Sequence, residues 1–340
     1  MRINWIDNLR GIGILLIVLG HTLMPEGSLL TKYIFSFHVV LFFILSGLLF
    51  NETKHINFRL FLKNKFLRLI IPFILFNIIF IIIAKLEGKF EGTRVIDFAV
   101  GLFYGDYLGD NGGVFQNGGF NLVNISTWFL PALFLTSLYY FGINKFIKNK
   151  NKKLVILFLI SIIIFIESKL TIFRLPWSAE IALMMTAFYG FANIFKKEIF
   201  NLVEKINIKS MFLLIPIILL HVFLLNSVNI STNYYGNYLG LILNSLLGFI
   251  TILIIAKNIG KNKFLDFIGK NSIIILGFEW IKIIIIENIN FLSFGLLQYN
   301  RGYLEGTIQF ILTILFLIPI IFIINKYFPF IIGLGYKKQN

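Results

Sequence analysis

Three ionisable side chains lie on the first apolar run of the chain, where such groups are costly and become candidates for function. Asp7, Arg10 and His21 fall on the run at residues 7–24. A separation of eleven residues is close to three helical turns, so Arg10 and His21 share one helix face, and Asp7 joins it. A neutral imidazole there can take a proton from a hydroxyl, as a general base does. The alternative is a hydrogen-bonded structural histidine beside an ion pair that anchors the helix at the membrane surface.

The same run sets the depth of these groups in a membrane. Arg10 and His21 are separated by a rise of about 16 Å in an α-helix, so His21 lies past the middle of the bilayer when Arg10 lies at its edge. Gly11, Gly13 and Gly20 make the helix thin, which predicts close packing of neighbouring helices against it.

The composition requires lipid as the solvent of this chain. Hydrophobic residues make up 58% of the 340 residues and charged residues only 14%, whereas soluble domains carry about 25% charged residues. In a soluble protein, a net charge of +15 would favour nucleic-acid binding. Here, most of the Lys and Arg residues lie in short segments between apolar runs, where they set the orientation of the chain in the membrane. The chain has no cysteine, which excludes disulfides, thiolate catalysis and cysteine metal sites.

Apolar runs long enough to cross a hydrocarbon core of about 30 Å predict an all-α integral membrane protein with about ten transmembrane helices. The runs lie at 7–24, 34–50, 68–85, 127–143, 154–169, 178–195, 211–227, 238–256, 271–288 and 307–325. Most of the 31 Lys and Arg residues fall in alternate connections, so the positive-inside rule places both termini in the cytoplasm. We therefore expect a multi-pass protein of the cytoplasmic membrane.

One connection, the predicted external segment at about 86–126, differs from the rest in length and composition. It carries Asp97, Asp106 and Asp110 and many Gly and Asn residues. Long loops with their own composition are more often functional than connecting, although a solvated loop without function is the alternative. No clear internal repeat is evident, which weighs mildly against the inverted-repeat transporter folds. Residues 1–340 are predicted to form a single transmembrane domain.

Two further side chains are predicted at the outer side of the membrane. His38 begins the second run on its way inward, near the level of His21. Trp128 lies at the outer edge of the fourth run, where it could stack on a sugar ring or belong to the belt of interfacial tryptophans. His221 and Glu180 also lie in the outward halves of spans, but nothing in the sequence ranks them above structural residues.

Four motifs in order along the chain resemble those of the acyltransferase-3 family, in the branch similar to fucose O-acetylases. They lie at Ile6–His21, Phe42–Phe50, Phe61–Pro72 and Trp128–Phe134. The first has a basic residue, ten residues and then histidine, and the second is an aromatic-rich Leu-Ser-Gly motif. The third is a basic-x-x-Arg motif that leads to a proline. The fourth motif resembles the corresponding segment of the fucose O-acetylase branch, and so does Phe37-His38 before the second run.

The resemblance is clearest over residues 4–134 and weaker beyond them. Lys65 stands where the family commonly has Arg, and Val39-Val40 stand where the branch often has Met-Pro. In the ninth run, Glu279 stands where relatives often carry histidine, which puts a second histidine role there in doubt. Glu279 could replace that histidine as an acid, base or hydrogen-bonding group, or mark a different substrate.

The resemblance implies a membrane enzyme that moves an acyl group, by preference acetyl, from cytoplasmic acyl-CoA to a sugar hydroxyl. His21 is predicted to be its general base or a transient acyl carrier, with Arg10 and Asp7 beside it in the catalytic set. Arg10, Lys65 and Arg68 are predicted to hold the CoA phosphates, or else only to mark the cytoplasmic side. His38, Trp128 and Glu279 are predicted to face the acceptor.

The predicted partners follow from that reaction. They are acetyl-CoA or another acyl-CoA as co-substrate, a glycan or its lipid-linked precursor as acceptor, and membrane lipids. Neither a metal ion nor a nucleic acid is expected, and a homo-oligomer is left open. Two alternatives remain from other classes: a transporter or flippase for a lipid-linked glycan, and a membrane scaffold without chemistry.

Overall fold

The protein is described by a computed structural model that covers residues 3–22, 27–51, 57–88, 95–104, 125–170, 175–281 and 302–334. Helices are the regular elements of these residues, and the described part of the chain contains no β-strand. The prediction of an all-α protein is thus confirmed. The chain forms two compact units, which divide within the third helix and are described separately below.

Unit 1 combines the start of the chain with residues from its second half. Its helices are α1 (Asn4–Gly20), α2 (Leu29–Phe35), the first part of α3 (His38–Leu49), α10 (Lys196–Lys205), η5 (Ile208–Leu213), α11 (Leu214–Phe223), α12 (Tyr238–Ile259), α13 (Lys263–Lys270), α14 (Ser272–Phe278) and most of α16 (Tyr303–Tyr327).

Unit 2 holds the middle of the chain. Its helices are α4 (Phe58–Lys65), η2 (Phe66–Ile70), α5 (Ile71–Leu86), α6 (Val95–Tyr104), η3 (Ile125–Trp128), α7 (Phe129–Phe146), α8 (Lys150–Leu170), η4 (Pro176–Ser178), α9 (Ala179–Ile194), η6 (Ile230–Thr232) and η7 (Pro329–Ile332).

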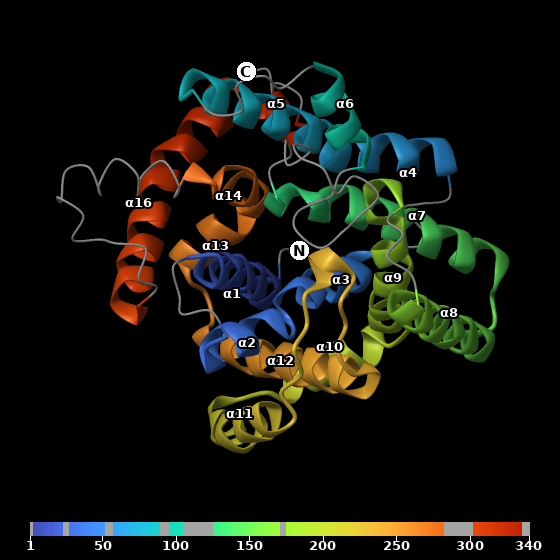
Figure 1. Ribbon diagram of the computed structural model, residues 1–340. Coiled ribbons are helices and arrows are strands. Elements are labelled where there is room, and N and C mark those ends of the chain that lie inside the picture. The colour runs from blue at the N-terminus through green and yellow to red at the C-terminus, as the bar shows by residue number, and fades with distance from the viewer. Residues whose placement is uncertain are drawn as a thin grey trace, which may run out of the picture. The chain divides into compact units, whose positions relative to one another are not determined.

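Helix α1 is the central helix of unit 1. It packs against α12, α13, α14 and α2, which surround it in Figure 1. Gly11 is needed for this packing, because a Cβ there would collide with the backbone oxygen of Leu265 in α13, and a Cβ at Gly20 would press tightly on the Phe35 ring of α2. The predicted role of the glycines in close helix packing is confirmed. The Asn8 amide fixes the register by donating to the carbonyl oxygens of Ala256, at 3.0 Å, and Gly260, at 2.6 Å.

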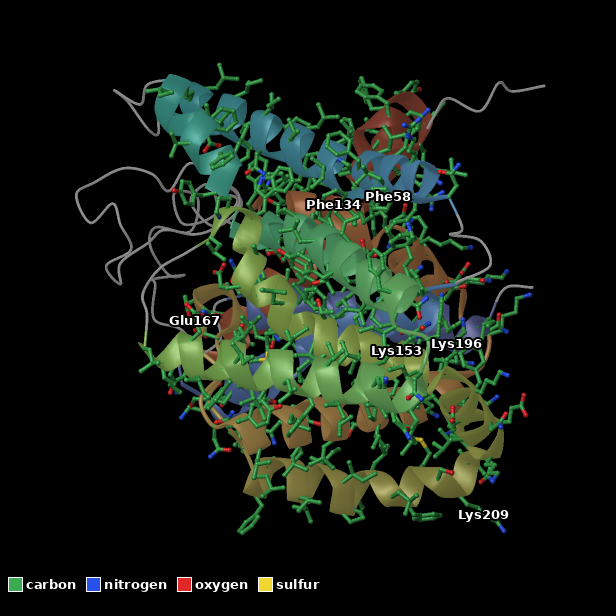
Figure 2. The ribbon with its side chains drawn as sticks, turned by 90° about the vertical axis from the view of Figure 1, so that its right-hand side faces the viewer. Phe58, Phe134, Lys153, Glu167, Lys196 and Lys209 are labelled. Atoms are coloured by element: carbon green, nitrogen blue, oxygen red, sulfur yellow. The ribbon has the colours of Figure 1, made fainter. Side chains whose placement is uncertain are left out.

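Unit 2 is organised around α7, α8 and α9, with α9 packed against both of the others. Figure 2 shows Glu167 and Lys153 near opposite ends of α8. The Lys153 side chain is buried and donates to the side-chain oxygen of Asn144 in α7, so its ammonium group keeps a hydrogen bond within the unit. A buried cation without such a partner is strongly destabilising, which explains the pairing.

The helices are those of a membrane protein, although their lengths differ from the predicted runs. A helix overlaps each of the ten runs. Among the described residues, four helical segments are long and apolar enough to cross a membrane, or five if the pair Pro176–Ile194 and Lys196–Lys205, bent by 64°, is one span. The four are Leu29–Leu49, Phe58–Leu86, Tyr238–Ile259 and Tyr303–Tyr327. The count of ten spans and the cytoplasmic termini stay predictions.

Short helices explain part of the difference, and charged or polar residues in the longer helices α7 and α8 explain more of it. Helices α1 and α9 have 17 and 16 residues, which at about 1.5 Å per residue makes each shorter than a hydrocarbon core of about 30 Å. The predicted external segment is also more than a loop, because it contains the apolar helix α6. Asp106, Asp110 and most of its glycines lie outside the described residues, as does the second half of the run at 271–288.

Gly47, in the motif at Phe42–Phe50, provides a test of the packing in unit 2. A Cβ at this position would collide with the backbone carbonyl of Tyr189 in α9, which cannot move away as a flexible side chain could. The Asn193 amide also ties α9 to α3 by donating to the oxygens of Gly47 and Phe50, both at 3.2 Å. We expect Gly47→Ala to lower the free energy of unfolding by about 1–3 kcal/mol, as overpacking does.

The matched control is Gly142→Ala in α7, where a Cβ would meet nothing within 4 Å. Alanine is favoured over glycine inside a helix by about 0.5–1 kcal/mol, so this variant should be neutral or stabilised. Thermal unfolding of both variants in the same detergent measures the difference. Equal melting temperatures would show that α3 and α9 do not approach each other as closely as described.

Candidate functional site

His21 lies at the end of α1, with its backbone in a conformation that is common at active sites. The helix ends at Gly20, earlier than the predicted run, and His21 forms its C-cap with φ −92° and ψ 0°. This lies in the sparsely populated bridge region, where many active-site residues are found. The His21 side chain is 27% exposed. The imidazole is therefore placed beyond the regular helix, where it can reach other elements of unit 1.

Glu279 is the direct partner of His21. It follows α14 as its C-cap, and its side chain has no exposed surface. The Nδ1 atom of His21 and the Oε1 atom of Glu279 are 2.7 Å apart. Because a carboxylate can only accept a hydrogen bond, Nδ1–H of His21 is the donor. The other nitrogen, Nε2, then carries the lone pair and can accept a proton.

His38 lies beside this pair, an adjacency that its predicted depth allowed but did not establish. The His21 and His38 rings are nearly perpendicular, with centroids 6.2 Å apart. The Phe35 ring packs against both, with centroid distances of 5.8 Å and 4.9 Å. Nδ1–H of His38 donates to the carbonyl oxygen of Ile34 at 2.8 Å, which again leaves Nε2 as the acceptor. Unit 1 thus brings together two imidazoles and one carboxylate.

Arg10 and Asp7 lie toward the other end of α1. The Nη1 atom of Arg10 is 3.9 Å from the Oδ1 atom of Asp7, and the Arg10 side chain is 31% exposed. Helical rise separates them from His21 by about 16 Å or more. The structure therefore places this ion pair along α1 at a distance from His21.

Lys65 and Arg68 belong to unit 2 and flank a rare element. Lys65 ends α4, and Arg68 lies in the π-helical turn η2, which continues into α5. π-Helical turns are uncommon and occur frequently at functional sites. Arg68 is exposed and Lys65 half-buried, with its Nζ atom 5.7 Å from the centroid of the Phe61 ring. Both cations are thus held on an irregular helical segment rather than on a loop.

Trp128 differs from what its position in the sequence suggested. It ends η3 in unit 2, and only 6% of its surface is exposed. Its ring packs edge-on near Phe129, with centroids 6.4 Å apart. A buried indole of this kind presents no open face to a sugar, and it does not resemble an interfacial belt residue either. Its predicted role in acceptor binding stays a prediction.

Sequence reasoning missed two features of the site. One is the pairing of His21 with Glu279, and the other is the hydrogen bond between the ring of His221 and Ser36, next to His38. In the sequence, only the position of Ser36, two residues before His38 at the start of the second run, could have indicated the hydrogen bond to His221. Within the described residues, no group of three or more His, Asp or Glu side chains is placed to hold a metal ion.

These features define a helical membrane protein with a histidine–carboxylate pair at the end of its central helix. The family model described as an acyltransferase domain matches residues 3–326, so the chain belongs to the acyltransferase-3 family. No curated protein and no solved structure matches the chain. The match identifies an acyltransferase, and it favours an enzyme over the transporter and the scaffold.

Proposed function

We propose that this acyltransferase moves an acetyl group, or another small acyl group, from acyl-CoA to a hydroxyl of a surface sugar or of its lipid-linked precursor. The observation that supports the proposal best is the 2.7 Å hydrogen bond between His21 and Glu279. It orients an imidazole whose second nitrogen is a proton acceptor, as a reaction that must deprotonate a hydroxyl requires. The resemblance to the fucose O-acetylase branch supports a sugar as the acceptor.

The reaction needs one base that returns its proton. Nε2 of His21 takes the proton of the sugar hydroxyl while the hydroxyl oxygen bonds to the thioester carbonyl carbon. The tetrahedral intermediate then expels the CoA sulfur, which takes the proton back from Nε2 and leaves as the thiol. Glu279 stabilises the imidazolium between the two steps. In the alternative, His21 itself accepts the acyl group and passes it on to the hydroxyl.

We propose that acyl-CoA, the acyl donor, binds through cationic side chains that contact its phosphates. Arg10, Lys65 and Arg68 supply these cations, and arginine in particular forms paired hydrogen bonds with phosphate. Asp7 keeps Arg10 in place through its ion pair. If Arg10 lies at the cytoplasmic face, as the charge pattern of the sequence predicts, the long pantetheine arm of CoA matches the separation of about 16 Å along α1.

The proposal is tested with purified protein in lipid vesicles, acetyl-CoA radiolabelled in its acetyl group, and envelope glycans and glycolipids of the producing cell. We expect label to appear in an alkali-labile ester on a glycan. A protein that is folded and moves glycolipid across the vesicle without consuming acetyl-CoA would instead support the flippase. Label that remains in acetyl-CoA or appears only in free acetate would contradict acyl transfer to a sugar.

Arg68 gives a separate test of donor binding. Removal of one cation from a phosphate site costs about 1.5–3 kcal/mol, so Arg68→Ala should raise the KM for acetyl-CoA about 10–100-fold with a smaller effect on kcat. Arg59→Ala is the control, because Arg59 is also an exposed basic residue, in α4 of the same unit. An equal KM in both variants would remove Arg68 from the donor site.

A further inference from the structure

The helix break between α2 and α3 determines how His38 is held. Helix α2 ends at Phe35 and α3 begins at His38, so the carbonyls of Tyr33 and Ile34 lose regular helical partners. The Ser36 hydroxyl donates to the oxygen of Tyr33 at 2.7 Å. Nδ1–H of His38 donates to the oxygen of Ile34 at 2.8 Å, beside a longer bond of 3.3 Å from the backbone N–H of Phe37. The break therefore fixes which nitrogen of His38 carries the proton.

A third histidine stabilises the same break. The Oγ atom of Ser36 is 2.8 Å from Nε2 of His221 in α11, and the His221 ring lies against Tyr33 with centroids 4.3 Å apart. The Ser36 hydroxyl proton is already donated to Tyr33, so Nε2–H of His221 is the donor in this contact. His221 is fully buried. It acts as a positioning residue for the segment that carries His38.

The site consequently contains two nitrogens, Nε2 of His21 and Nε2 of His38, that can each accept a hydrogen bond. Nε2 of His21 and Nε2 of His38 have no hydrogen-bond partner among the described residues, while the Nδ1 atoms of both rings are engaged. One sugar hydroxyl carries one proton and can satisfy only one of them. When a bound substrate covers the two rings and excludes water, an acceptor left without a donor is costly, so a second donor is then needed.

We propose that His38 accepts a hydrogen bond from a second hydroxyl of the acceptor, next to the one that is acylated, so that the enzyme selects vicinal diols. The ring centroids, 6.2 Å apart, leave room for two neighbouring hydroxyls that each make a hydrogen bond of about 2.8 Å. This inference rests on the proposed function, because it assigns His21 to the reacting hydroxyl. It adds a substrate class, a sugar with a free hydroxyl beside the acylated one.

The test is a cycle that combines one variant with one change in the acceptor. The glycoside of the sugar found to be labelled is compared with its analogue that lacks the neighbouring hydroxyl, using radiolabelled acetyl-CoA. The wild-type protein should prefer the diol about 10–100-fold in kcat/KM, as expected for a buried acceptor left unpaired. In His38→Asn this preference should fall to near unity. The asparagine amide can still donate to Ile34, but no acceptor remains in place of Nε2.

Two results would overturn the inference. One is a natural product whose acyl group has no free hydroxyl on an adjacent carbon, and the other is a diol preference that survives in folded His38→Asn. The second would show that a water molecule or another group satisfies His38. Should His38→Asn fail to fold, Ser36→Ala tests the same contact, because loss of the Ser36 hydroxyl releases the break and should reduce the preference in part. Failure of the proposed function gives a different result, since no labelled glycan would form at all.

Discussion

Replacement of His21 with asparagine is expected to lower kcat for acyl transfer by about 10²–10⁴, the usual contribution of a general base. Asparagine is chosen because its amide nitrogen can replace Nδ1–H as the donor to Glu279, whereas nothing replaces Nε2. The variant thus keeps the contact that joins the end of α1 to the end of α14 and removes only the proton acceptor. Transfer of radiolabelled acetyl groups in vesicles measures the loss.

The matched control is His55→Asn, at a histidine that the sequence places in a connection between two apolar runs. It should keep full activity. Thermal unfolding of both variants separates a chemical effect from a folding defect. A folded His21→Asn protein that transfers acetyl groups at the wild-type rate would exclude His21 both as the base and as an acyl carrier.

His21 also shows how far the sequence could lead. Helical spacing alone put Arg10 and His21 on one helix and separated them by about half of the membrane thickness. In the structure, Arg10 lies in the first half of α1 and His21 forms its C-cap. The glycine pattern correctly indicated that this helix is tightly surrounded. The shared helix face and the small residues that allow close packing are both properties of a single helix, and the periodic pattern of its sequence reveals them.

The partner of His21 could not be predicted, because it comes from the far end of the chain. His21 and Glu279 are separated by 258 residues, and no local pattern records which helix ends meet. The departure from the family at Glu279 was visible in the sequence, but its meaning needed the contact. In the structure, the acidic residue that stands where relatives often carry histidine is the hydrogen-bond partner of the central histidine.

Trp128 shows a distinction that hydropathy cannot make. An aromatic residue at the edge of an apolar run is typical of an interfacial position, and hydropathy cannot distinguish this from burial. The structure buries the indole in unit 2, where η3 leads into α7. The break between α2 and α3 was equally hidden, since the run through Ser36 and His38 is apolar enough to continue as one helix.

Glu279→Gln provides the second prediction with a large expected effect. Glutamine can still accept the hydrogen bond of Nδ1–H, but it lacks the charge that stabilises the imidazolium. Because hydrogen bonds to charged groups contribute about 1.5–3 kcal/mol, kcat should fall about 10–100-fold. The KM for acetyl-CoA should change little, since the donor phosphates are proposed to bind elsewhere. In Glu279→Ala, kcat should fall further, because Nδ1–H of His21 then has no hydrogen-bond acceptor.

The decisive measurement is the double variant. If Glu279 acts only through His21, then Glu279→Gln should cost almost nothing in a His21→Asn background, because the imidazolium that it stabilises no longer forms. If Glu279 is itself the base, or contacts the acceptor independently, the two losses should multiply. Coupling therefore distinguishes a positioning carboxylate from a reacting one. The 2.7 Å contact and the complete burial of Glu279 lead us to expect strong coupling.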